Sequence, residues 1–101
     1  LALKALKESN GHAEYVSDTE IIEAMRLLAK LEGIFAEPSG VACVAGLLKM
    51  IENGIVDKNE ETVCIITGSG LKDVKSGKRI SKKPLHVGAE VKEIRTALSK
   101  E

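Results

Sequence analysis

The residues best suited to contact a ligand follow an apolar, β-branched run at positions 62–66. That run leads directly into Thr67-Gly68-Ser69-Gly70. In open α/β sheets ligands bind outside the carboxyl ends of the strands, so the Thr67 and Ser69 hydroxyls would face such a ligand. Glycine allows a backbone to approach a ligand closely. A plain turn at the end of a strand fits the same residues, and the sequence leaves both interpretations open.

A second candidate is Glu37-Pro38-Ser39-Gly40, at the predicted start of a helix. A helix N-terminus with small residues can hold an anion, and the Glu37 carboxylate could act as a general base. A capped helix start explains the same residues without a ligand. His12 and His86 have no partner at catalytic or metal-ligand spacing, so we predict no metal site and no catalytic histidine.

The two cysteines, Cys43 and Cys64, each lie inside an apolar run. Neither belongs to a Cys-x-x-Cys pair or has a histidine at ligand spacing, so we expect buried free thiols in a reducing compartment. No apolar run approaches the roughly 20 residues of a membrane span. The first residues lack the pattern of a signal peptide. The predicted location is the cytoplasm.

The composition is that of a small globular domain. The 101 residues are 44% hydrophobic and 30% charged, and 15 basic residues balance 15 acidic ones. A balanced charge does not steer a chain toward nucleic acid or an anionic membrane. Two aromatic residues are too few for a platform on which bases stack. We therefore predict no nucleic-acid and no membrane partner.

The elements before the second motif are predicted from caps and periodicity. A helix ends at Asn10-Gly11 and a short strand covers residues 12–16. Ser17 and Glu20 form a capping box that begins a second helix, and Gly33 ends it. The buried stripe of that helix is predicted to hold Ile21, Met25, Leu28 and Leu31.

The remaining elements do not form a complete fold. A helix capped by Ser39 or Gly40 runs to residue 52 or 53, and it is apolar or glycine throughout 41–48. Such a helix belongs in the interior of a protein larger than this chain. Residues 62–67 are predicted to be a strand buried on both faces, which needs partner strands. We therefore expect a fragment of a larger α/β protein, whose uncovered apolar surface self-associates.

The last part of the chain is predicted to be a linker and a helix. Residues 72–83 contain six basic residues and one acidic residue, a pattern typical of a solvated linker. After Pro84 a helix is expected, with its apolar stripe formed by Val87, Val91, Ile94 and Leu98.

Three segments in matching order resemble the C-terminal part of threonine synthase. They read VSDTEI (16–21), EGIFAEPS (32–39) and VCIITGSGLKD (63–73). That family depends on pyridoxal phosphate and has fold type II, the tryptophan synthase β-like fold. The resemblance implies an α/β C-terminal fragment of the large cofactor-binding domain, with helices packed on one or a few mostly parallel strands. Residues 1–101 then form one segment, family-like over 1–73, with a basic linker and C-terminal helix over 74–101.

The resemblance also implies an activity. Threonine synthases convert O-phospho-L-homoserine and water to L-threonine and phosphate, and we expect the parent enzyme to be a homo-oligomer. The threonine that opens the Thr-Gly-x-Gly motif hydrogen-bonds the pyridine nitrogen of the cofactor, and this role maps onto Thr67. The family's Schiff-base lysine and its phosphate-binding glycine loop lie in upstream motifs that do not occur here. The resemblance therefore implies one wall of a site, no catalytic residue in this chain, and an inactive fragment.

Several alternatives stay open. Ser69 stands where the family often has His or Asn, so a related enzyme, cysteate synthase or one like threonine dehydratase, also fits. Apart from the resemblance, the chain could be a standalone module that binds phosphate through its Gly-Ser-Gly turn. It could also be an interaction module that docks through its basic stretch and C-terminal helix.

Overall fold

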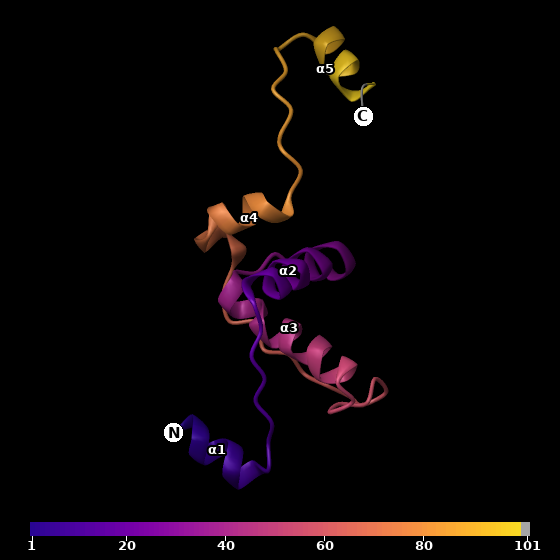
Figure 1. Ribbon diagram of the computed structural model, residues 1–101. Coiled ribbons are helices and arrows are strands. Elements are labelled where there is room, and N and C mark those ends of the chain that lie inside the picture. The colour runs from indigo at the N-terminus through magenta and orange to yellow at the C-terminus, as the bar shows by residue number, and fades with distance from the viewer. Residues whose placement is uncertain (100–101) are drawn as a thin grey trace.

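The computed structural model describes residues 1–99, which are mainly helical (Figure 1). The elements are α1 (Ala2–Ser9), α2 (Asp18–Glu32), α3 (Pro38–Glu52), the short 3₁₀ helix η1 (Gly70–Lys72), α4 (Val74–Ile80) and α5 (Val91–Leu98). No strand forms within residues 1–99. Their only β-type pairing is an isolated antiparallel bridge between Ala36 and Ser69.

Helix α2 begins and ends where the sequence predicts. The Ser17 hydroxyl accepts a hydrogen bond from the Glu20 N–H at 3.3 Å, and the Glu20 carboxylate accepts one from the Ser17 N–H at 2.6 Å. At the other end Gly33 has a φ of 68°, in the left-handed region that favours glycine. Both predicted boundaries of this helix are confirmed.

The core lies where α2 packs against α3. Its buried residues are Ile22, Ala24, Met25, Ala36, Val41 and Ala45. The predicted stripe is wrong in part, because Leu31 is 64% exposed whereas Ala24 is buried. The small side chains of Ala24 and Ala45 let the helices approach closely, so the line of contact passes through them. Met25 and Val41 are the largest fully buried side chains.

The N-cap of helix α3 lies two or three residues before the predicted caps. Glu37 is the N-cap, in place of Ser39 or Gly40, and Pro38 occupies the first helical turn, where its missing N–H costs no hydrogen bond. The predicted end of the helix is confirmed. The helix is not covered on every side along 41–48, since Val41 and Ala45 are buried but Cys43, on the opposite side, is exposed.

Residues 61–67 form an extended segment that runs back along α3 (Figure 1). The predicted burial of this segment on both faces is wrong for this chain: Val63 is 85% and Ile65 is 74% exposed. Cys64 and Ile66 alternate with them and are partly buried. The segment pairs with no strand within residues 1–99, and the short strand predicted over 12–16 does not form either.

The basic stretch contains a helix that was predicted as linker. The Asp73 carboxylate accepts a hydrogen bond from the Ser76 N–H at 3.0 Å and so caps α4. Ile80 of α4 packs against the core, and the Arg26 guanidinium of α2 donates to the Arg79 carbonyl oxygen at 3.3 Å. The cap and these contacts give a helix where composition alone predicts a solvated linker.

Helices α1 and α5 lie apart from the packed centre (Figure 1). Neither buries a residue, and Asn10 ends α1 in the left-handed conformation with a φ of 51°. The radius of gyration is 18.5 Å, against about 13 Å for a compact domain of about 100 residues. Both terminal helices are as predicted, except that Val87 precedes α5 and is not part of its stripe.

Candidate functional site

The two motifs that the sequence singles out meet in the structure. The Glu37 N–H donates to the Gly68 carbonyl oxygen at 3.0 Å, and the Gly70 N–H donates to the Phe35 carbonyl oxygen at 3.1 Å. These bonds flank the bridge between Ala36 and Ser69. The start of α3 and the loop that follows the extended segment therefore form one site rather than two.

Glycine makes this close contact possible. A Cβ on Gly40 would lie 3.0 Å from the Gly68 nitrogen and 3.3 Å from the Thr67 nitrogen. A side chain on Gly68 would overlap the Glu37 carboxylate. The first turn of α3 and the loop thus touch through backbone, which leaves the neighbouring hydroxyls free of bulky cover.

Thr67 and Ser69 have different roles in the loop. The Ser69 hydroxyl accepts a hydrogen bond from the Leu71 N–H at 3.3 Å and caps η1. Thr67 is exposed, and its hydroxyl makes no hydrogen bond to any of residues 1–99. The turn is therefore held by Ser69, whereas the Thr67 hydroxyl remains available to a ligand.

Glu37 lines the same site as a half-buried residue. Its carboxylate accepts a hydrogen bond from the Ser39 hydroxyl at 3.0 Å and does not cap the helix that it precedes. The carboxylate lies beside Gly68, and the general-base role of Glu37 stays a prediction.

Asp73 and Phe35 fix the far side of the loop, and the sequence interpretation missed both roles. Hydrogen bonds from the Ser76 hydroxyl and N–H hold the pKa of the Asp73 carboxyl below its ordinary value, so this cap is ionised at neutral pH. The Phe35 ring occupies the space that a side chain on Gly70 or Gly77 would need.

The other predicted candidates lie outside the site. His12 is 3.9 Å from the Glu14 carboxylate, and His86 precedes α5 on the C-terminal arm. No group of three or more potential metal ligands occurs among the described residues. None of the helices in residues 1–99 has the length and apolar character needed to cross a bilayer.

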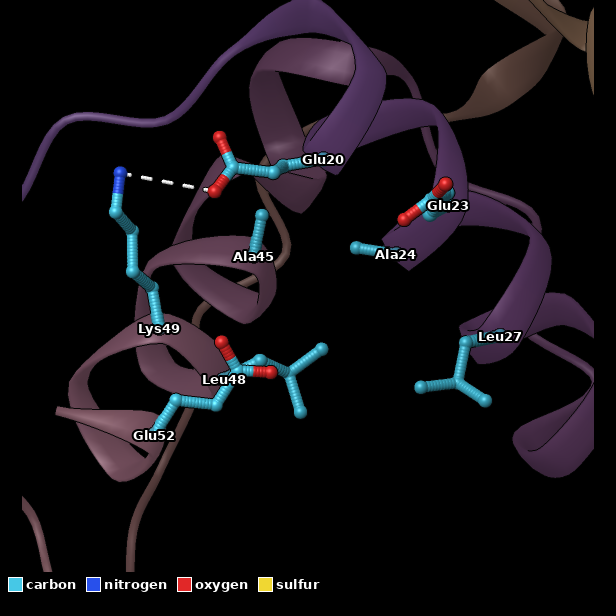
Figure 2. A pocket seen from close by; sticks show the side chains of 8 residues that line it. All are labelled: Glu20, Glu23, Ala24, Leu27, Ala45, Leu48, Lys49 and Glu52. Carbon is cyan, nitrogen blue, oxygen red and sulfur yellow. Dashed lines mark ion pairs between the residues drawn. The ribbon is translucent and has the colours of Figure 1, made fainter. Parts of the chain in front are cut away.

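A separate groove lies between α2 and α3 (Figure 2). It encloses about 270 Å³ and is lined by Glu20, Glu23, Ala24, Leu27, Ala45, Leu48, Lys49 and Glu52. The Lys49 amine lies 3.6 Å from the Glu20 carboxylate and donates to the Tyr15 carbonyl oxygen at 2.8 Å. The one amine of this groove is therefore already paired, and Thr67 does not line it.

Comparison with known proteins gives consistent matches. The profile of the family described as "Pyridoxal-phosphate dependent enzyme" matches residues 1–68. The chain is 45% identical over 97 residues to a protein of Methanocaldococcus jannaschii named threonine synthase, and 44% identical over 97 residues to one of Methanosarcina acetivorans with the same name. A threonine synthase of a Bacillus species is 50% identical over 72 residues.

The aligned region is most of this chain but only a small part of each relative. The two archaeal alignments include 96% of this chain but 24% of each relative, and the Bacillus alignment includes 71% of this chain and 20% of the relative. The chain thus spans about a quarter of the length of the archaeal relatives. Both archaeal alignments extend beyond the residues that the family profile matches.

Proposed function

This chain belongs to the pyridoxal-phosphate dependent enzyme family, and we propose that it forms the C-terminal part of the catalytic domain of a threonine synthase. The relatives that bear this name support the proposal with 44–50% identity. The structural observation that carries it is the unpartnered, exposed Thr67 hydroxyl at the junction of the two motifs. In this proposal the intact enzyme converts O-phospho-L-homoserine and water to L-threonine and phosphate.

The residues present fit one wall of a pyridoxal phosphate site. A hydroxyl can donate one hydrogen bond to a ring nitrogen, and Thr67 has such a donor with no partner within residues 1–99. The glycines at 68 and 70 leave the loop beside it without side chains. Thr67 is accordingly the residue that we propose to hold the cofactor in this chain.

Thr67 also influences the chemistry available at the site. When bound, pyridoxal phosphate supplies an electron sink for negative charge that develops on the substrate carbons. The Thr67 hydroxyl is too weak an acid to give its proton to the ring nitrogen, so it orients the ring without charging it. A carboxylate at position 67 would keep that nitrogen protonated. A neutral partner suits a replacement reaction that must avoid transamination.

The other parts of the site belong to motifs outside these residues. The sequence contains no Ser-Phe-Lys motif and no glycine-rich phosphate loop of the family type. We therefore propose that the 101-residue chain has no catalytic residue of its own. Mixed with pyridoxal phosphate, it should show only weak, nonsaturable binding to surface lysines. Saturable binding of one cofactor per chain would contradict this.

In the proposed parent enzyme the extended segment would gain partner strands. Residues 61–67 would become a strand of an α/β domain with mostly parallel strands, which places Thr67 at the carboxyl end of that strand. Residues 1–101 would form a single segment of that domain, with α4 and the C-terminal arm over 74–101. We further propose a homo-oligomeric enzyme of the cytoplasm.

The experiment is a chimera in which this chain replaces the matching quarter of the Methanocaldococcus jannaschii threonine synthase. We expect the chimera to bind pyridoxal phosphate and to release threonine and phosphate in equal amounts from O-phospho-L-homoserine. Thr67→Ser keeps the hydroxyl and serves as the matched control for Thr67→Ala. A folded chimera that binds the cofactor but makes no threonine would contradict the proposed activity, and one that does not bind the cofactor would contradict the proposed site.

A further inference from the structure

The two cysteines face each other across the contact between α3 and the extended segment 61–67. The Cys43 thiol of α3 donates to the Ile65 carbonyl oxygen at 3.5 Å, one residue beyond Cys64. Side chains alternate along extended backbone, so the side chain of Cys64 points to the side opposite those of Val63 and Ile65. Because Val63 is 85% and Ile65 is 74% exposed, the side of Cys64 is the one toward α3.

The local environment of the thiols agrees with this placement. Partial burial raises the pKa of the Cys64 thiol, and the neighbouring Cys43 thiol raises it further by its charge and by a hydrogen bond. Both thiols are free. The prediction that both are buried is wrong, because Cys43 is exposed and Cys64 is only half-buried. In the 101-residue chain a small reagent can therefore reach the pair.

We propose that Cys43 and Cys64 form an oxidation site, at which a disulfide joins α3 to the extended segment. A disulfide requires two cysteines whose side chains converge from neighbouring backbones, and this contact provides them. The bond would fasten the segment three residues before Thr67 to the helix whose first turn touches Gly68. The proposal does not depend on the cofactor or on the proposed reaction.

The oxidant is a low-molecular-weight disulfide such as oxidised glutathione. The Cys43 thiolate, the more exposed of the two, attacks one sulfur of the reagent, forms a mixed disulfide and releases one glutathione thiolate. Cys64 then loses its proton to water and attacks the Cys43 sulfur, which forms the internal bond and releases the second glutathione thiolate. The protein gives up two electrons and two protons, and one oxidised glutathione becomes two reduced molecules.

The test equilibrates the full chain in glutathione buffers of increasing oxidised-to-reduced ratio. Free thiols are then trapped at low pH and the products are resolved by mass spectrometry. We expect an internal bond, seen as the loss of two hydrogen atoms from the chain and as a linked peptide that contains both cysteines. Half-oxidation should need at least about tenfold less oxidised glutathione in buffer than in urea, because folding holds the thiols together. Equal ratios in buffer and in urea would overturn the proposal.

A matched variant moves the second thiol to the opposite face of the same segment. Val63→Cys combined with Cys64→Ser keeps two cysteines at nearly the same separation in sequence but turns one of them toward solvent. We expect this variant to accumulate mixed disulfides with glutathione instead of the internal bond. An internal bond that forms equally readily in this variant, or interchain dimers as the main product of the natural sequence, would overturn the proposal.

Discussion

Helices α2 and α3 and the extended segment 61–67 lie side by side, yet this chain completes them to different degrees. The two helices satisfy their own backbone hydrogen bonds, have defined caps and bury Met25 and Val41 between them. The segment has no partner strand within residues 1–99 and exposes Val63 and Ile65. The helical region is therefore complete within this chain, whereas the segment exposes apolar side chains that partner strands would cover in the proposed parent enzyme.

This difference indicates which part of the site would depend on the rest of the proposed parent enzyme. A helix needs only residues close in sequence, whereas a strand needs neighbours that lie far away along the chain. Thr67 stands at the end of the element that lacks its neighbours. The start of α3, which forms the other side of the site, is already in place. The proposed cofactor contact is thus the feature of this chain that its parent must complete.

The largest expected effect is a difference in stability between a substitution in the helical core and one in the extended segment. Met25→Ala removes a side chain that is 2% exposed, so we expect the free energy of unfolding to fall by about 3 kcal/mol. Val63→Ala changes a residue that is 85% exposed and should alter it by less than about 0.5 kcal/mol. Urea unfolding followed by circular dichroism measures both. Similar losses for the two variants would mean that the segment is buried against something in the free chain.

A smaller effect is expected at the site itself. In the chimera, Thr67→Ala should weaken cofactor binding by up to about tenfold, because one hydrogen bond contributes roughly 0.5–1.5 kcal/mol. Thr67→Asp should change the ratio of transamination to replacement more than it changes affinity. The free energy of unfolding should remain the same in both variants, since the Thr67 hydroxyl holds no part of the turn. If stability falls while affinity and product ratio stay unchanged, Thr67 is a structural residue.

The smallest effect concerns the pH dependence of stability and involves the capping box of α2. Hydrogen bonds from Ser17 hold the pKa of the Glu20 carboxyl below its ordinary value, and Lys49 lowers it further. A pKa lowered by folding adds stability above the unfolded pKa, and this stability is lost as the pH falls through the folded pKa. Glu20→Gln should therefore flatten the acid side of the stability curve below about pH 5. Part of the pH dependence of stability should remain in this variant, because the pKa of the Asp73 carboxyl is lowered too. An unchanged curve in Glu20→Gln would contradict the capping role.

The sequence predicts best what local chemistry decides. The Ser17 capping box, the Gly33 stop and the end of α3 all follow from residues within one turn of the boundary. The motif that contains Thr67 was also visible, together with the family that it resembles. Helix α4 was missed because six basic residues outweighed the single cap at Asp73.

The long-range contacts could not be predicted from the sequence. Nothing in the residue pattern brings Ala36 to Ser69 or turns Cys43 toward Cys64, since these contacts depend on how the chain folds back along α3. The burial of residues 62–67 was predicted from their apolar character alone. Within residues 1–99 no strand covers the segment, so Val63 and Ile65 are exposed.

Hydrogen exchange of the backbone amides at residues 63–66 tests most directly whether the rest of the enzyme completes this segment. In the free chain at low concentration these amides should exchange at nearly the unprotected rate, while amides in the middle of α2 exchange slowly. In the chimera the same four amides should become protected, because neighbouring strands accept their hydrogen bonds. Protection that is already present in the free chain, or that fails to appear in a folded chimera, would contradict the assignment of this segment to the sheet of a larger pyridoxal phosphate enzyme.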